Sequence, residues 1–167
     1  SSKDGLSISP KRITVSTAGI AKMIKKLADD EVKFNLALSL HTADDKKRDE
    51  IMPINQSINI AKLEESIKYF YERTGTRVTY EYILFNGIND SIEDANKLLK
   101  LCKKTPSKVN LIEYNMVDGF PYKKSTNKQT DMFIKYLEEK NIVVNLRRSK
   151  GKDINAACGQ LVNKLKK

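Results

Sequence analysis

The sequence predicts an α/β fold built on a parallel sheet. Strand-like and helical segments alternate along the chain, with short connections between them. The apolar run at residues 34–40 is also too continuous for a strand with one face in water, whereas parallel strands are covered on both faces. Parallel strands joined by right-handed crossovers produce this pattern. We therefore expect about four β/α units, followed by one further strand and a tail.

The first two strands are predicted at residues 12–17 and 34–40. Residues 12–17 are rich in β-branched side chains and end at Ala18-Gly19, after which the apolar spacing becomes helical. The apolar positions of that helix are Ile20, Met23, Ile24 and Leu27. The charged stretch that follows the second strand, up to Glu50, is interpreted as a connection.

A second long helix is predicted between Asn59, a residue type that caps helix amino termini, and Gly75, which stands where a terminating glycine is expected. Residues 78–84 predict the third strand. Residues 91–94 have the pattern of a capping box and begin the next helix. Cys102 lies on the apolar stripe of that helix, so we interpret it as a packing residue.

The remaining elements are a strand at residues 109–114, a loop at 115–124, a helix beginning at Ser125 and a final strand at 143–148. Four apolar side chains of that helix recur at helical spacing and are expected to face inward: Met132, Phe133, Tyr136 and Leu137. In folds of this class, ligands bind at the carboxyl ends of the strands.

Polar residues gather where the predicted strands end. They are Ser16, Thr17, Ser39, His41, Glu81, Asn115 and several members of the loop at 86–90. Any one of them alone fits a turn or cap residue, since polar residues end most strands. Together, on one rim of the sheet, they predict a site for a polar, extended small molecule.

The charge balance favours a polyanionic partner. The chain of 167 residues carries 31 Lys and Arg against 21 Asp and Glu, a formal net charge of +10. Nucleic acid is the leading class, because neutralised phosphates release counterions. Surface lysine without a specific partner would give the same count.

The two cysteines lack metal-ligand spacing, which favours a reducing compartment over a disulfide framework. No apolar run approaches the roughly 20 residues that are required to cross a bilayer. The amino terminus shows no signal-peptide pattern. We therefore expect a cytoplasmic protein without membrane contact.

Cys158 differs from Cys102 because it lies among small residues, in the segment 151–161. Nearby basic residues favour the thiolate, which is the nucleophilic form of the group. They are Arg147, Arg148, Lys150 and Lys152. The alternative is a small buried hydrophobe, as free cysteines usually are. On the residues alone, Cys158 is a candidate nucleophile.

Five segments of the chain resemble the RlmN/Cfr family of radical S-adenosylmethionine (SAM) RNA methyltransferases. They occur in the family's order and spacing, at residues 12–20, 39–41, 51–55, 109–115 and 151–161, the last with the specific run Ala-Ala-Cys-Gly-Gln-Leu. The resemblance implies a partial (β/α) barrel of the radical SAM type that methylates adenosine in RNA. Residues 12–148 would form the β/α units, and residues 149–167 the segment with Cys158 and a basic tail.

The resemblance also implies the site residues. The positions that match Ser16, Ser39, Leu40, His41 and Asn115 contact SAM in this family, and the cysteine that matches Cys158 carries the methyl group. An aromatic carbon of adenine is too weakly acidic for ordinary displacement. The family therefore methylates the cysteine first and then activates that methyl group with a 5′-deoxyadenosyl radical. The RNA contacts are expected among the basic residues at 147–152.

The sequence departs from the family in several parts of the radical machinery. With only Cys102 and Cys158, it lacks the Cys-x3-Cys-x2-Cys motif that holds a 4Fe-4S cluster. The Gly-Glu segment, the second catalytic cysteine and the amino-terminal accessory domain are also missing. We therefore expect residues 1–167 to be the carboxyl-terminal portion of a radical SAM core domain. Alone it should be inactive, because it needs the missing part and an electron donor for the cluster.

Two alternatives stay open. Cfr-type members methylate carbon 8 of adenosine, and we favour the RlmN type, which makes 2-methyladenosine in 23S ribosomal RNA and in tRNA, because it is the commoner. A non-catalytic RNA-binding module is the alternative from another class, although it would not require an intact cysteine motif. No glycine-rich phosphate loop supports a generic phosphate-binding enzyme.

Overall fold

The computed structural model describes residues 8–117 and 119–148, which form a five-stranded parallel sheet. The strands are β1 (Thr14–Thr17), β2 (Asn35–Ser39), β3 (Val78–Ile83), β4 (Ser107–Ile112) and β5 (Val144–Arg147). Their order in the sheet is β1-β2-β3-β4-β5, so each strand pairs with the next one along the chain. This arrangement confirms the predicted α/β fold with consecutive β/α units.

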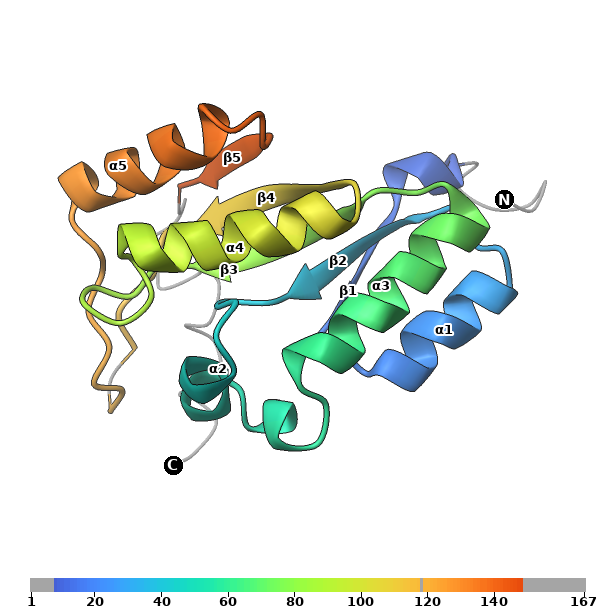
Figure 1. Ribbon diagram of the computed structural model, residues 1–167, viewed down its shortest axis with the longest axis horizontal. Coiled ribbons are helices and arrows are strands. Elements are labelled where there is room, and N and C mark those ends of the chain that lie inside the picture. Colours follow the sequence, from blue (N-terminus) through green and yellow to red (C-terminus); the bar gives the residue numbers. More distant parts are fainter. Residues whose placement is uncertain (1–7, 118, 149–167) are drawn as a thin grey trace.

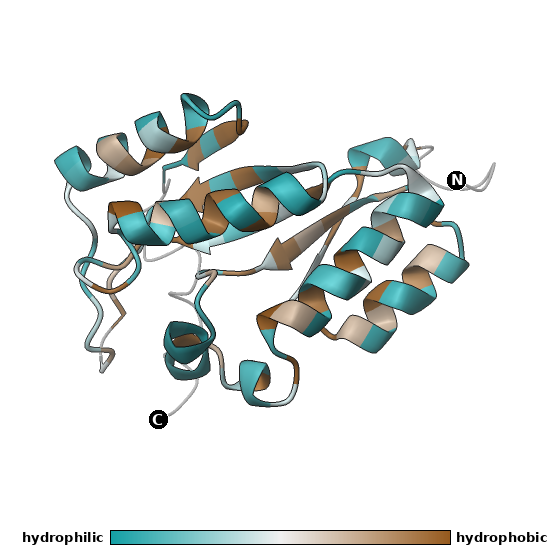
Figure 2. Ribbon diagram, in the orientation of Figure 1, coloured by the Kyte–Doolittle hydropathy of each residue, from teal (hydrophilic) through white to brown (hydrophobic). Residues whose placement is uncertain are grey.

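Four helices lie together on one side of the sheet (Figure 1). They are α1 (Ala21–Asp29), α3 (Ile60–Thr74), α4 (Ile92–Lys104) and α5 (Asn127–Glu138). Each of them mixes hydrophobic and hydrophilic residues around its circumference (Figure 2), as expected for a helix with one buried side. Shorter elements complete the described part of the chain: the 3-10 turns η1 (Pro10–Arg12) and η2 (Pro53–Gln56), and the helix α2 (Asp45–Ile51).

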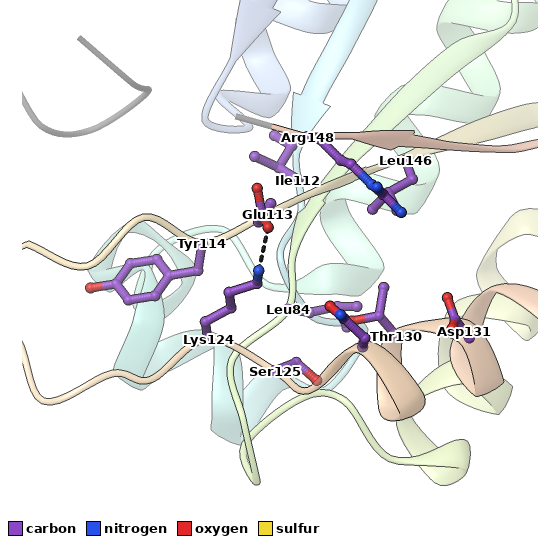
Figure 3. Close-up of a pocket in the computed structure, with 11 residues that line it drawn as sticks. Leu84, Ile112, Glu113, Tyr114, Lys124, Ser125, Thr130, Asp131, Leu146 and Arg148 are labelled. Carbon is purple, nitrogen blue, oxygen red and sulfur yellow. Dashed lines mark hydrogen bonds and ion pairs between the residues drawn. The ribbon is translucent and has the colours of Figure 1, made fainter. Parts of the chain in front are cut away.

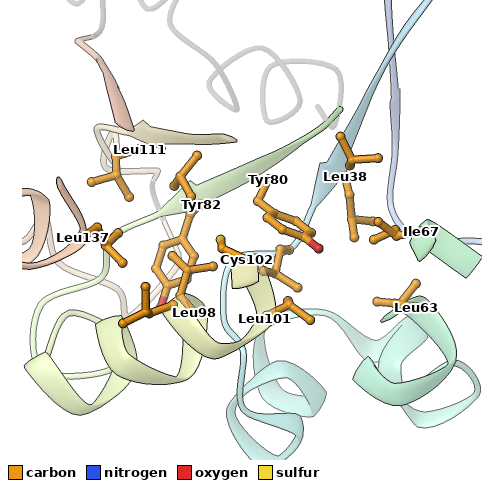
Figure 4. Packing of buried hydrophobic residues seen from close by; sticks show 14 of the residues in the cluster. Leu38, Leu63, Ile67, Tyr80, Tyr82, Leu98, Leu101, Cys102, Leu111 and Leu137 are labelled. Carbon is orange, nitrogen blue, oxygen red and sulfur yellow. The ribbon is translucent and has the colours of Figure 1, made fainter. Parts of the chain in front are cut away.

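The hydrophobic core fills the space between the sheet and these helices. Alternate residues of β3 point into it, and Figure 4 shows Tyr80 and Tyr82 packed against α4. The ring of Tyr82 lies with its centroid 5.4 Å from that of Phe133 in α5. Cys102 is only 5% exposed here, and burial raises the pKa of its thiol to about 11. Its predicted packing role is confirmed.

The opposite face of the sheet, called the polar face below, carries the side chains between those core positions. Paired residues of parallel strands share a face, and one such row joins Ser39 of β2, Glu81 of β3, Asn110 of β4 and Asn145 of β5. Ser16 of β1 pairs with Ala37 and so lies on the same face. The sheet therefore separates an apolar, helix-covered face from a polar one.

Local capping signals determine where the long helices begin and end. The side chain of Asn59 accepts a hydrogen bond from Lys62 N at 3.1 Å, and Gly75 ends α3 with φ of 65°. Ser91 and Asp94 form the predicted capping box at the start of α4. The last helix begins at Asn127, two residues later than predicted, because Thr126 is its cap.

Two sequence predictions are corrected. Met132 is 43% exposed rather than inward, whereas Phe133 is fully buried. Successive residues of a helix point 100° apart. Because Phe133 points into the core, Met132 lies at the edge of the buried side of α5. The charged stretch after β2 is not a simple connection, since it contains the helix α2, capped by Asp44. This helix has no apolar stripe by which it could be recognised.

The turn from β1 into α1 depends on Gly19. Its φ is 105°, outside the region that L side chains favour, and its N–H donates to Thr17 Oγ1 at 3.1 Å. A Cβ at this position would lie 2.7 Å from Leu63 Cδ2 in α3. The glycine thus allows α3 to pack closely over the end of the first strand.

Candidate cofactor site at the strand ends

The segment Ser39-Leu40-His41 follows the end of β2 and is held to the neighbouring strand by its backbone. The N–H groups of Leu40 and His41 both donate to the carbonyl oxygen of Glu81, at 3.0 and 3.2 Å. His41 adopts φ of 58°, a left-handed conformation that is uncommon for residues with a side chain. The bend exposes Ser39 and His41 partly, while the side chain of Leu40 is fully buried in the core.

The ring of His41 is fixed by a hydrogen bond. Its Nδ1 accepts from the backbone N–H of Ile83 at 3.2 Å, and the His41 carbonyl accepts from Asn89 Nδ2 at 2.6 Å. Burial, together with the positive charge of Arg48, lowers the pKa of His41 to about 4. The ring is therefore neutral at pH 7 with its proton on Nε2, and it presents a hydrogen-bond donor.

The side chain of Arg48 in α2 is fully buried and contacts the backbone at the carboxyl ends of β1 and β2. Its Nε donates to Leu40 O at 3.1 Å, and its Nη2 donates to Ala18 O and Ser39 O at 3.1 and 3.2 Å. Its Nη1 donates to Asn55 Oδ1 at 2.9 Å. One guanidinium thus joins the carboxyl ends of β1 and β2 and orients the segment that carries His41.

Asn55 completes this arrangement. Its Nδ2 donates to Asp49 Oδ1 at 2.8 Å and to Asp45 Oδ1 at 3.0 Å, so the carboxylates lie near the buried guanidinium. Burial lowers the pKa of Arg48, and the two carboxylates oppose that shift. The motif at residues 51–55 therefore has a structural purpose. Sequence reasoning missed Arg48, because an arginine in a charged stretch resembles a surface residue.

Asn115 lies in the loop after β4 and is 7% exposed. Within residues 8–117 and 119–148 its Nδ2 has no hydrogen-bond partner. Buried polar groups almost always have one, so this donor fits an acceptor from outside the described residues. Asn115 is the best-supported of the predicted cofactor contacts.

The other predicted contacts differ in what they can offer. Ser16 is exposed on β1 and Ser39 is half-buried, and both lie on the polar face. Leu40 contributes no side chain to this face, so any contact would involve its backbone. Cys158, Lys150 and Lys152 lie outside the described residues.

A separate cavity of about 120 Å³ lies between the ends of β4 and β5 and the start of α5 (Figure 3). Glu113 and Lys124 form an ion pair beside it, and Arg148 lines it. None of the predicted cofactor residues is among its lining residues. It is also smaller than the roughly 300 Å³ of typical ligand pockets, so it does not match the predicted cofactor site.

The residues present do not fit an iron-sulfur cluster. In the described part of the chain, no group of three or more His, Cys, Asp or Glu side chains could hold a metal ion. The sequence contains two cysteines, and Cys102 is enclosed in the core.

Within the part of the chain that the structure describes, no helix is both long and apolar enough to traverse a bilayer.

Comparison with known proteins gives close relatives. No family model matches the chain. It is 51% identical over 163 residues to a protein of Flavobacterium psychrophilum named probable dual-specificity RNA methyltransferase RlmN, covering 98% of this chain and 47% of that protein. The protein of the same name from Cytophaga hutchinsonii is 53% identical over 163 residues, with 98% and 45% covered. The chain thus spans about half the length of the curated relatives it matches.

A solved structure shows the same relationship. The crystal structure of a radical SAM methyltransferase from Sphaerobacter thermophilus matches with a TM-score of 0.91 and 35% identity, covering 95% of this chain and 47% of that one. Its strands and helices therefore correspond closely to those of this chain. As its motifs predicted, the chain is similar over nearly its whole length to RlmN-named RNA methyltransferases and shares its fold with a radical SAM methyltransferase.

Proposed function

We propose that the chain is part of a cytoplasmic radical SAM RNA methyltransferase of the RlmN type. The complete enzyme makes 2-methyladenosine in 23S ribosomal RNA and in tRNA. The observation that carries this proposal is the identity of about half of all residues with RlmN-named proteins over 98% of the chain. This segment alone is inactive, because its two cysteines cannot hold the 4Fe-4S cluster and the remaining parts of the enzyme supply it.

The rim of the sheet holds the cofactor in this proposal. Asn115 donates through its unpartnered Nδ2, and neutral His41 donates through Nε2, so both suit acceptor atoms of a nucleoside. Ser16 and Ser39 add hydroxyl groups on the polar face, and Leu40 contacts the cofactor through its backbone. When bound, SAM supplies a methyl group and a radical that abstracts hydrogen.

Cys158 carries the methyl group to the RNA. Its thiolate accepts the methyl group as a thioether, and the basic residues before it favour that thiolate. Arg147 and Arg148, the last described basic residues of the chain, are exposed and suit phosphate contacts. The complete enzyme also depends on an electron donor for the cluster.

The test replaces Cys158 by Ala in the longer enzyme that contains this segment. Methylation should disappear, because the carrier sulfur is lost, while RNA affinity stays within about twofold, since phosphate contacts dominate binding. Cys102→Ala is the matched control, because it removes a thiol from the core and should leave turnover measurable. Mass analysis of the nucleosides reads out both variants. Undiminished methylation by Cys158→Ala would overturn the mechanism.

The same nucleoside analysis separates the alternatives. RlmN-type activity yields 2-methyladenosine, and 8-methyladenosine would assign the protein to the Cfr type. A protein that binds RNA and produces neither, with cluster and cofactor loaded, would be a binding module.

A further inference from the structure

A row of hydrogen-bonded polar side chains crosses the polar face. Asn145 Nδ2 of β5 donates to Asn110 Oδ1 of β4 at 3.2 Å, and Asn110 Nδ2 donates to Glu81 Oε1 of β3 at 2.8 Å. The row therefore ends in a carboxylate whose first oxygen is occupied and whose orientation is fixed. None of these three residues is among the SAM contacts that the family resemblance implies, although Glu81 is one of the polar strand-end residues noted in the sequence.

The second oxygen of Glu81 has no hydrogen-bond partner within the described residues, although Glu81 is only 8% exposed. Arg147 Nη1 lies 3.9 Å away, which supplies charge but exceeds hydrogen-bond distance. A buried carboxylate oxygen without a donor is costly, so a donor from elsewhere is expected. The one other such acceptor in this part of the chain, Thr105 Oγ1, follows α4 at the opposite end of the sheet.

The position of Glu81 indicates which donor it meets. Glu81 pairs with Ser39, one of the cofactor residues, and its row ends on β5, from which the chain continues to Cys158. Under the proposed function, the target base must approach both the cofactor and Cys158. In the order of the strands, Glu81 on β3 lies between β2, which carries Ser39, and β5, the last described strand.

We propose that Glu81 Oε2 accepts a hydrogen bond from the exocyclic amino group of the target adenine. This inference rests on the proposed function and names the residue that selects the base. A base displaced from its stack is recognised through its hydrogen-bonding edge. A carboxylate accepts from an amino group and repels a carbonyl oxygen, so Glu81 distinguishes adenine from a base with a carbonyl at that position.

The experiment compares adenosine with inosine at the target position of an oligoribonucleotide, because inosine carries a carbonyl in place of the amino group. Binding is measured by fluorescence anisotropy and methylation by mass analysis, with the longer enzyme. The wild type should prefer adenosine by about 10- to 100-fold. Glu81→Gln keeps the oxygen that Asn110 contacts but presents an amide donor. This variant should bind and methylate the adenosine oligoribonucleotide at least tenfold less well than the wild type. It should bind and methylate the inosine oligoribonucleotide better.

Glu72→Gln is the matched control, because Glu72 is exposed on α3, and its preference should equal that of the wild type. Unchanged preference in Glu81→Gln, with normal thermal unfolding, would overturn the inference. So would a loss of SAM affinity in calorimetry without a change in preference, since Glu81 would then serve the cofactor. A wild type that binds selectively but methylates neither RNA would refute the proposed function and leave base selection by Glu81 supported.

Discussion

At the scale of single residues, His41 shows how the fold prepares a donor. The ring cannot accept a proton readily, because burial disfavours its charged form and Arg48 places a positive charge nearby; Nδ1 also already accepts from Ile83 N–H. A neutral imidazole keeps the same hydrogen-bonding pattern through the physiological pH range. The left-handed backbone at this residue is maintained by the bond from Asn89 to its carbonyl.

This environment makes stability depend on pH in a defined direction. The pKa of His41 is about 4 in the folded chain and about 6.5 when unfolded, so the unfolded state binds more protons between these values. The contribution of the neutral His41 ring to the free energy of unfolding is fully present above pH 6.5. It is lost as pH falls toward 4, by at most about 3 kcal/mol. His41→Asn keeps an acceptor for Ile83 N–H and tolerates positive φ but does not titrate. Urea unfolding should show the wild type losing stability relative to this variant below pH 6.5, and parallel curves would contradict the assignment.

At the scale of elements, the β1–α1 turn and the end of α3 use glycine for different reasons. Gly19 combines a φ of 105° with a close approach of Leu63, whereas Gly75 has a φ of 65° and open space around it. Gly19→Ala should therefore cost about 2 kcal/mol or more, since both strain and overlap arise. Gly75→Ala should cost about 1 kcal/mol from backbone strain alone. Equal losses in urea unfolding would show that Leu63 moves aside freely.

The elements also show how far sequence reasoning reaches. Asn59, Gly75 and the capping box at Ser91 were predictable because each signal acts within one helical turn. The helix α2 was not, because its central residue Arg48 binds Ala18 O, 30 residues away, and that contact exists only in the folded chain. The candidate site likewise contains features that local sequence signals indicate and features that arise only in the folded chain. His41 and Asn115 were predicted from motifs, whereas the oxygen of Glu81 without a partner in the described residues required coordinates.

At the scale of the whole molecule, the two faces of the sheet have separate tasks. The helices and one face enclose the apolar core, so the polar face can carry charged and amide groups without disturbing it. Function can therefore vary by substitution on the polar face while the core keeps the fold. This separation is characteristic of parallel α/β architectures.

The first strand is an edge of the sheet, and we expect the isolated chain to self-associate through it. β1 pairs only with β2 within the described sheet, and Val15 at its centre is 36% exposed. Unpaired strand edges invite pairing between copies, and lysine on an edge opposes it. Sedimentation or size-exclusion chromatography at high concentration should show association that Val15→Lys weakens. A monomeric wild type would contradict this expectation.

The strand order carries a consequence for synthesis. Because every strand lies beside its predecessor in the sequence, no later segment has to insert between two strands that have already paired. A nascent chain emerging from the ribosome can extend the sheet by one unit at a time, always at the β5 side. Loop closure then spans only neighbouring units, which keeps the entropic cost of each addition small.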